Sequence, residues 1–266
     1  MAELGARGID CVAASRDPER ARARLGAEVR VVRFEVDDAR SLAAALDGVD
    51  ALVLVPPEAA AETKCGFARR VAEAAARGGV TRVATVSGLS AARDEDSVSR
   101  RVEREVEASG LAWTHLRPNF FMQNYHTAYR ESVRSGAIAF YTGAGRTSLV
   151  DARDVGAVAA AALLDPRWEG RAEPLTGPEA FDGDEIAAIL SRATGREIRN
   201  AARSHEDTRA ALRAAGLPEA SVEASLARFR EVEAGHFEAV SPALGEILGR
   251  SPRSFAAYAR EYAHHW

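Results

Sequence analysis

Short, mostly apolar runs alternate with longer amphipathic segments along the first half of this chain. The apolar runs predict strands at residues 9–14, 29–34, 51–55, 82–86 and 112–116. Strands that are apolar along their whole length and alternate with helices are typical of a parallel sheet with helices on both faces. The pattern therefore predicts an α/β fold.

The segments between these runs carry the signals that begin and end helices. After the first run, Asp17 is suited to an N-cap, Pro18 to the first helical position and Gly26 to a helix end. Further helices are predicted at 39–46 and 58–77. We therefore expect a helix between each pair of strands.

Right-handed crossovers bring the carboxyl ends of parallel strands to one edge of a sheet. The residues at or just past the ends of the predicted strands are Arg16, Asp37, Pro56, Ser87 and Pro118. Because ligands of open α/β sheets bind outside this edge, we expect these residues to frame one groove. The aromatic-rich segment 118–125 would open a helix at the same edge; the alternative is a core strand followed by a helix start without chemistry.

The pattern changes in the second half of the chain. Short strands are predicted at 138–141, 147–150 and 173–176, and an alanine-rich helix at 155–164. From residue 204 onward the sequence predicts helical hairpins. This part is expected to add the last elements of the sheet and a small, mostly helical subdomain.

Composition narrows the functional classes. The 266 residues are 47% hydrophobic and 28% charged, with a formal charge of −4, which gives no reason to expect nucleic-acid or membrane binding. No apolar run reaches membrane length and no signal peptide is apparent, so a cytoplasmic protein is expected. Cys11 and Cys65 lack the spacing of metal ligands, and no metal is predicted.

A dinucleotide-binding sheet of this kind begins with a strand, a glycine-rich turn and a helix, because the pyrophosphate needs backbone N–H groups. No such glycine motif precedes Ile9. The strand that belongs to it is central in the usual order, so its absence would leave two strand edges unpaired. We favour a start site placed too late; the alternative is a real truncation that cannot hold the pyrophosphate.

Several short motifs, in their order and spacing, resemble one family. They are Ser-Arg-Asp-Pro-Glu at 15–19, Asp-Asp at 37–38, Leu-Val-Leu-Val-Pro at 52–56, the segment 109–124, Val-Asp-Ala-Arg-Asp-Val at 150–155 and Leu-Thr-Gly-Pro-Glu at 175–179. The chain resembles the NmrA-like group of atypical short-chain dehydrogenase/reductases, which includes NAD(P)H:quinone oxidoreductases and ergot-alkaloid-type reductases. The resemblance implies a Rossmann-like, doubly wound sheet without its first strand. Residues 1–150 would be the NAD(P)-binding domain, and 151–266 the last sheet elements with a helical substrate-binding cap.

The resemblance also implies which residues hold the cofactor. They are Arg16, Asp37, Val55, Pro56, Ser87, Gly88 and Pro118. Arg16 would accommodate the adenosine 2′-phosphate, which favours NADP(H) over NAD(H). The alternatives are a solvated arginine at Arg16 and a helix N-cap at Asp37.

The implied substrate pocket contains Ser87, Asn119, Phe120, Met122 and Asn124, although aromatic side chains more often belong to a core. No catalytic residue is assigned. The Tyr-x-x-x-Lys pair of short-chain dehydrogenases is absent from residues 94–103, where Glu95 and Ser99 stand near its positions. The charged residues of this region are interpreted as a solvated helix face; they are Arg100, Arg101, Glu103, Arg104 and Glu105.

The favoured function is hydride transfer from NADPH to a quinone-like or conjugated carbonyl molecule. A quinone needs little acid assistance, so the missing pair does not exclude it. The alternatives are a non-catalytic regulator that senses dinucleotides and an inactive remnant. A small-molecule substrate is the expected partner, without nucleic acid or membrane, and the chain is expected to be a monomer or homodimer.

Overall fold

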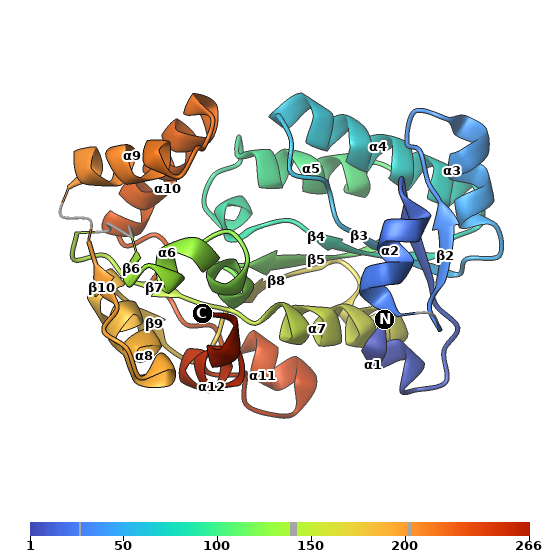
Figure 1. Ribbon diagram of the computed structural model, residues 1–266. Helices are drawn as coiled ribbons and strands as arrows, with labels where there is room; N and C mark the ends of the chain where they lie inside the picture. The colour runs from blue at the N-terminus through green and yellow to red at the C-terminus, as the bar shows by residue number, and fades with distance from the viewer. Residues whose placement is uncertain (27, 139–142, 202–203) are drawn as a thin grey trace. The chain divides into compact units, whose positions relative to one another are not determined.

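The computed structural model describes residues 1–26, 28–138, 143–201 and 204–266 (Figure 1). The chain folds into two compact units. Unit 1 comprises residues 1–117 and 156–174, and unit 2 comprises residues 118–155 and 175–266. The chain thus crosses between the units more than once, unlike the single boundary at residue 150 that the sequence predicts.

Unit 1 holds the predicted parallel sheet. Strands β3 (Ala51–Leu54), β4 (Arg82–Val86), β5 (Ala112–Pro118) and β8 (Arg171–Leu175) lie side by side in this order, and β1 (Val12–Ser15) pairs with β2 (Arg30–Arg33). The pairs β1–β2, β3–β4 and β4–β5 are all parallel. The predicted α/β fold is therefore confirmed.

The helices of unit 1 also follow the sequence signals. They are α1 (Ala2–Gly5), α2 (Pro18–Leu25), α3 (Ala39–Leu46), α4 (Ala61–Arg77) and α5 (Val98–Glu107), with the 3₁₀ turns η1 (Leu89–Ala92) and η3 (Pro166–Trp168); α7 (Ala152–Leu164) is shared with unit 2. Asp17 caps α2 as predicted. The alternative that Asp37 caps α3 is wrong, because the Asp38 carboxylate accepts from the N–H groups of Arg40 and Ser41 instead.

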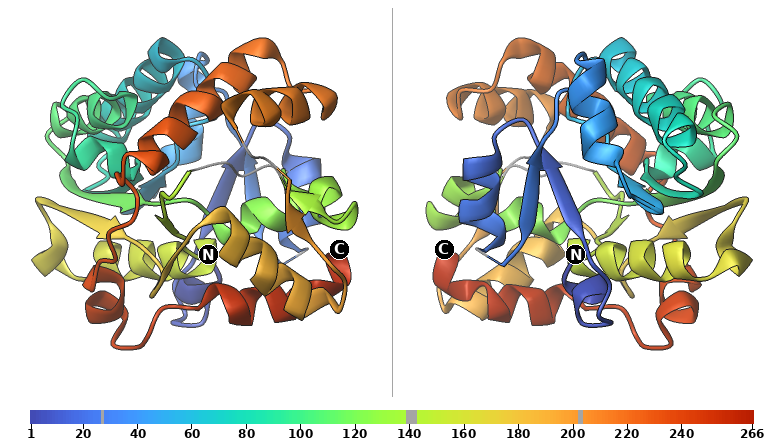
Figure 2. Two further views of the ribbon diagram at one scale, coloured as in Figure 1. Left: turned by 90° about the vertical axis from the view of Figure 1, so that its left-hand side faces the viewer. Right: turned by 90° about the vertical axis from the view of Figure 1, so that its right-hand side faces the viewer.

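Small side chains allow the helices of unit 1 to approach the sheet closely. Ala68, Ala72 and Ala75 on α4 are fully buried and belong to one apolar cluster with Leu54 and Val83 of the sheet. Helices α4 and α5 lie side by side over one face, and residues 156–164 of α7 cover the other (Figures 1 and 2). Burial on both faces explains why the interiors of β3 and β4 are largely apolar.

Among the described residues of unit 1, strands β1 and β3 each have an edge without a neighbouring strand, as do the outer strands β2 and β8. Within the described residues, β1 pairs only with β2, and β3 pairs only with β4 on its side of the four-stranded sheet. Val53 and Val55, in and just after β3, are 39% and 60% exposed. The prediction of two unpaired edges is therefore confirmed for these residues.

Unit 2 is mostly helical, as predicted for the C-terminal part. It contains η2 (Met122–His126), α6 (Arg130–Arg134), α8 (Gly183–Thr194), α9 (His205–Ala214), α10 (Glu219–Glu233), α11 (Ala243–Leu248), α12 (Phe255–Glu261) and η4 (Ala263–His265). Strands β6 (Ala137–Ile138) and β10 (Arg199–Asn200) pair in parallel, and β7 (Thr147–Ser148) and β9 (Ala180–Phe181) pair antiparallel. The rest of the strand predicted at 138–141 lies outside the described residues.

The described residues include no helix that combines the length and the apolar composition needed to cross a bilayer.

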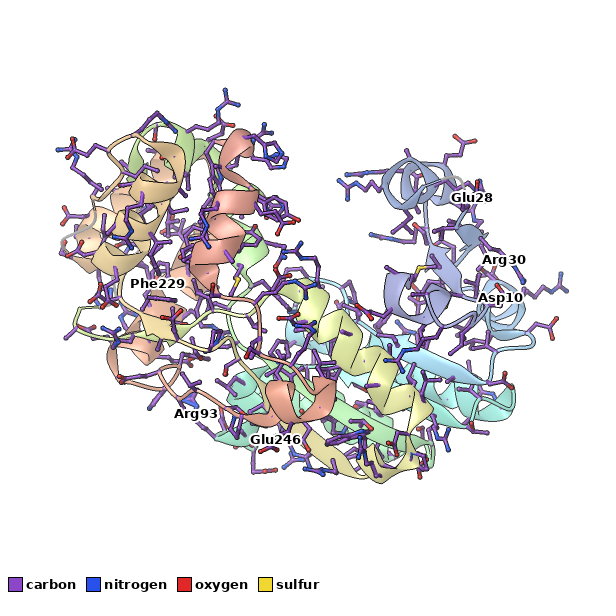
Figure 3. All side chains as sticks on the ribbon, turned by 90° about the horizontal axis from the view of Figure 1, so that it is seen from below. Asp10, Glu28, Arg30, Arg93, Phe229 and Glu246 are labelled. Atoms are coloured by element: carbon purple, nitrogen blue, oxygen red, sulfur yellow. The ribbon has the colours of Figure 1, made fainter. Side chains whose placement is uncertain are left out.

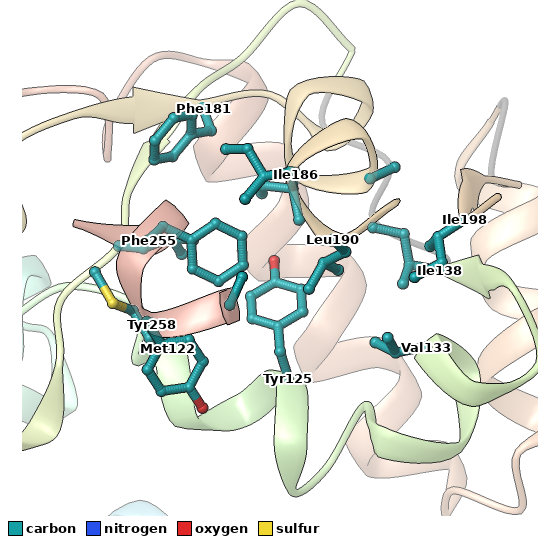
Figure 4. Packing of buried hydrophobic residues seen from close by; sticks show 14 of the residues in the cluster. Met122, Tyr125, Val133, Ile138, Phe181, Ile186, Leu190, Ile198, Phe255 and Tyr258 are labelled. Carbon is teal, nitrogen blue, oxygen red and sulfur yellow. The ribbon is translucent and has the colours of Figure 1, made fainter. Parts of the chain in front are cut away.

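The core of unit 2 packs around Tyr125. Its side chain lies among apolar residues that include Ile186, Leu190 and Phe255 (Figure 4). The Tyr125 hydroxyl is buried and has no hydrogen-bond partner among the described residues, whereas the hydroxyl of Tyr258 contacts Nδ1 of His126. A buried polar group without a partner costs free energy, because it has lost its hydrogen bonds to water.

We expect Tyr125→Phe to raise the free energy of unfolding by about 1 kcal/mol, because it removes an unsatisfied hydroxyl without creating a large cavity. Tyr258→Phe is the control, and it should lower the stability because His126 loses its partner. Denaturant titrations of both variants measure the difference. A destabilised Tyr125→Phe protein would contradict the expectation.

Candidate functional site

Parallel pairing brings the ends of neighbouring strands of unit 1 together. Ser15, the last residue of β1, stands opposite Arg33, the last residue of β2. In the other sheet, the Ser87 N–H donates to the Leu116 carbonyl at 2.9 Å, so the end of β4 lies beside the end of β5. Neighbouring strand ends therefore meet within each sheet of unit 1, and the expectation that Arg16, Asp37, Pro56, Ser87 and Pro118 frame one groove stays a prediction.

A hollow of about 680 Å³ lies at the ends of β1 and β2. Its lining residues come from β2, from α2 and from the turn before α2; they are Arg16, Asp17, Pro18, Glu19, Arg22 and Arg33. Arg33 was not among the predicted site residues. Its position near the end of a predicted strand could have indicated a site residue. The sequence alone, however, does not show which residue of the neighbouring strand stands opposite it.

The turn before α2 fixes the position of Arg16. The Ser15 hydroxyl accepts from the Asp17 N–H at 3.2 Å, and the Asp17 carboxylate accepts from the Arg20 N–H at 3.0 Å. The Asp17 carboxylate is therefore committed to the helix end. Arg16 itself is exposed, and no ion-pair partner is found for it among the described residues. Its guanidinium group is available to an anion.

The other residues predicted to hold the adenosine part lie on the surface of unit 1. Asp37 is exposed and pairs with Arg70 at 3.1 Å. Val55 is 60% exposed and Pro56 is half-buried, directly after β3. A contact of these residues with a cofactor remains a prediction.

Ser87 lies in a buried polar network that sequence reasoning missed. Its hydroxyl donates to Oε1 of Glu103 at 2.6 Å. Arg117 donates to both oxygens of the same carboxylate, through Nε at 2.9 Å and Nη2 at 2.7 Å. Glu103 is completely buried, whereas 15% of the Arg117 side chain is exposed. The network joins α5 to the ends of β4 and β5.

The interpretation of this helix as a solvated face is wrong for Glu103 and for Arg100, whose side chain is only 18% exposed. Arg100 bonds Glu107 through two nitrogens, at 2.5 and 3.2 Å, and reaches Glu103 at 3.3 Å. The sheet packs against this side of α5 and carries Arg117. Helical periodicity alone does not reveal a charged residue on the partner strand.

Electrostatics keep the Glu103 carboxylate ionised. Burial by itself raises the pKa of Glu103, but hydrogen bonds from Arg117 and Ser87 outweigh it, and the net pKa lies below its ordinary value. An ionised carboxylate can only accept hydrogen bonds. The single proton of the Ser87 hydroxyl is therefore directed at Glu103, and Ser87 can offer only lone pairs to another molecule.

His115 completes this network on β5. It is completely buried, as predicted, and its Nε2 lies 3.2 Å from Oε1 of Glu107. Its ring stacks on Trp113 at 4.3 Å. Burial lowers the pKa of His115, so the imidazole is neutral near pH 7.

One group of possible metal ligands occurs among the described residues. Ligand atoms of Glu103, Glu107 and His115 lie within 4.8 Å of one another. Arg117 and Arg100 already donate to these carboxylates and balance their charge. The geometry therefore fits an ion-pair network better than a cation site.

At the positions where short-chain dehydrogenases carry the tyrosine and the lysine, this chain has Glu95 and Ser99. Glu95 precedes α5 and pairs with Arg104 at 2.5 Å. The Ser99 hydroxyl accepts from Ser90 at 3.2 Å. A Cβ atom at Gly88 would lie 2.9 Å from Oγ of Ser99, so a larger residue there would require the Ser99 hydroxyl to move.

In unit 2, two of the predicted substrate residues are used by the fold itself. Asn119 is 5% exposed, and its Nδ2 donates to Oγ of Ser148 and to the Phe237 carbonyl, both at 2.8 Å. Met122 is completely buried in the core. A role of these two side chains against a substrate stays a prediction.

The remaining predicted residues of unit 2 differ in exposure. Pro118 is buried at the end of β5. Phe120 and Asn124 are half-buried, and the Phe120 ring meets that of Phe237 edge to face at 5.5 Å. Phe120 and Asn124 are therefore the more accessible members of the predicted substrate set in this unit.

Comparison with known proteins gives a consistent result. A protein family described as NAD(P)H-binding matches residues 1–166. An NAD(P)H azoreductase of Xenophilus azovorans is 34% identical over 253 residues, which cover 93% of this chain and 87% of that protein. Quinone oxidoreductase 2 of Escherichia coli is 27% identical over 211 residues, covering 78% and 73%.

The fold is also found in solved structures. The NADPH-dependent quinone oxidoreductase of Escherichia coli in complex with NADPH superimposes with a TM-score of 0.82 and 24% identity, over 94% of this chain and 89% of that one.

The Glu103 network predicts how stability depends on pH. Because the folded-state pKa of Glu103 lies below its ordinary value of 4.5, its contribution is complete above about that pH and is lost as the pH falls through the folded-state pKa. We expect Glu103→Gln to be less stable by about 3 kcal/mol at pH 7, since Arg117 loses its charged partner. The variant should also lose less stability on acidification to pH ~3 than the parent protein.

Glu62→Gln is the matched control, because the Glu62 side chain on α4 is 83% exposed and pairs at 2.6 Å with Arg101, which lies on the same helix as Glu103. An exposed pair of this kind contributes at most about 1 kcal/mol. Denaturant titrations from neutral to acidic pH provide the comparison. If Glu103→Gln and Glu62→Gln lose the same free energy of unfolding, the buried network contributes no more to stability than an exposed ion pair.

Proposed function

Since the chain belongs to the NAD(P)H-binding family, we propose that it is an NAD(P)H-dependent oxidoreductase that reduces a quinone-like or conjugated carbonyl molecule. The resemblance to the NmrA-like group is confirmed by the family match and by the reductases among the relatives. The names of two relatives, an azoreductase and a quinone oxidoreductase, support an acceptor with a conjugated system.

The choice of a conjugated hydride acceptor rests on the hydrogen bond from Ser87 to Glu103. A simple ketone needs an acid to protonate the developing alkoxide, and short-chain dehydrogenases use a tyrosine for this step. Ser87 directs its proton at a buried carboxylate, and residues 94–103 contain neither tyrosine nor lysine. An acceptor whose reduced form is stable as an anion, such as a quinone, avoids that need and can take its proton from water.

The cofactor is proposed to be NADP(H) rather than NAD(H). The hollow beside β1 fits a phosphate group, because Arg16 is exposed there while the Asp17 carboxylate is committed to the end of α2. When bound, the nicotinamide would supply the hydride. Arg16 would hold the 2′-phosphate and Asp37, Val55 and Pro56 the adenosine side. Ser87, Gly88 and Pro118 would complete the proposed set.

An alternative function is a non-catalytic module that senses dinucleotides, which the absent Tyr-x-x-x-Lys pair favours. A protein of this kind would bind NADPH and transfer nothing.

Turnover distinguishes the two functions. We expect NADPH to be oxidised in the presence of a small quinone, and an unconjugated ketone to remain unreduced because no acid assists it. The decrease of NADPH absorbance with each acceptor gives the rates. If the protein binds NADPH but none of several small quinones leads to its oxidation, the sensor is favoured.

Arg16→Ala tests the cofactor preference. A hydrogen bond between charged groups contributes roughly 1.5–3 kcal/mol, and exposure reduces this, so we expect an approximately tenfold loss of NADPH affinity. The affinity for NADH should change less than about twofold, since NADH has no 2′-phosphate. Fluorescence titrations measure both. Equal losses for the two cofactors would remove this role from Arg16.

A further inference from the structure

We propose that Arg33 is a second determinant of cofactor specificity and that it binds the 2′-phosphate together with Arg16. This inference rests on the proposed function, since it refines the same nucleotide site. It assigns the phosphate to two guanidinium groups, one following β1 and one ending β2.

The strand register places the two arginines together. Arg33 is paired with Ser15, and Arg16 follows Ser15 directly. Neighbouring strands lie about 4.8 Å apart, and a phosphate monoester can bridge two long side chains that leave adjacent strand ends. Both residues line the same hollow of about 680 Å³. Its volume leaves room for a phosphate with its sugar.

The other charges of the hollow are already committed or exposed to water. Arg22 donates through Nη2 to the Val31 carbonyl at 3.1 Å, and the Asp17 carboxylate caps α2. Glu19 lies in the exposed first turn of α2. Arg16 and Arg33 are therefore the cations most able to turn toward a ligand.

Arg33 is held only weakly in the free protein. Its side chain is 72% exposed and has one long contact of 3.4 Å with Oε1 of Glu35. An exposed single contact of this length stabilises little. A doubly charged phosphate, which accepts paired hydrogen bonds from a guanidinium group, can replace it.

The test compares Arg33→Gln with Arg30→Gln. Arg30 is an exposed arginine at the opposite end of the same strand, where it stands opposite Val12 of β1; Figure 3 shows its side chain in unit 1. Both variants change the net charge equally, so they separate local phosphate binding from long-range attraction. The probes are NADPH, NADH, adenosine 2′,5′-bisphosphate and adenosine 5′-monophosphate, titrated at low and moderate salt.

We expect Arg33→Gln to weaken the binding of NADPH and of the bisphosphate about tenfold. The binding of NADH and of the monophosphate should weaken less than about twofold. Arg30→Gln should leave all four affinities within about twofold. Combining Arg16→Gln with Arg33→Gln should remove the preference for the 2′-phosphate. Added salt should weaken NADPH binding more in the parent protein than in Arg33→Gln.

Two failures are distinguishable. If the parent protein prefers NADPH and Arg33→Gln matches Arg30→Gln, the role of Arg33 is overturned while the proposed function stands. If the parent protein binds neither dinucleotide, the proposed function fails. In that case the affinities for the two adenosine phosphates test the role of Arg33. If Arg33→Gln weakens binding of the bisphosphate but not of the monophosphate, the role is supported. If it weakens neither, the role is overturned.

Discussion

The buried ion pair between Glu103 and Arg117 is the interaction on which the candidate site of unit 1 depends. It joins α5 to β5, and through the Ser87 hydroxyl it also reaches the end of β4. Removing one partner would leave a charge without compensation in a region closed to water. The same pair keeps Glu103 ionised, so a structural contact also determines the hydrogen-bonding character of Ser87.

This character limits the chemistry that the site can assist. The exposed arginines at the ends of β1 and β2 suit the binding of a phosphorylated nucleotide, whereas the Ser87 hydroxyl at the end of β4 offers an acceptor and no acidic proton. Such a site is better at binding and orienting reactants than at protonating them. A conjugated acceptor suits such a site, because it stabilises its own negative charge and needs the protein only for binding and orientation.

The polar residues of unit 2 show why a motif does not reveal a role by itself. Asn119 stands in the segment that resembles a substrate pocket, yet its amide joins Ser148 to the chain near Phe237. Met122 and Tyr125 of the same segment form the core around which α8 and α12 pack. A segment rich in aromatic and amide side chains can serve a pocket, a core or both, depending on what packs against it.

The sequence by itself determined the local structure and the class of the fold. Apolar runs and capping residues such as Asp17 predict strands and helices because they act through nearest neighbours, and the alternation of elements predicts the parallel sheet. The family resemblance added NAD(P)H as the cofactor and the expectation that Arg16 contacts it. Only the tertiary structure decided that Arg33 stands opposite Ser15 and that Glu103 is buried against Arg117. These contacts join residues distant in the sequence, and their existence depends on strand register and helix rotation, which local periodicity does not specify.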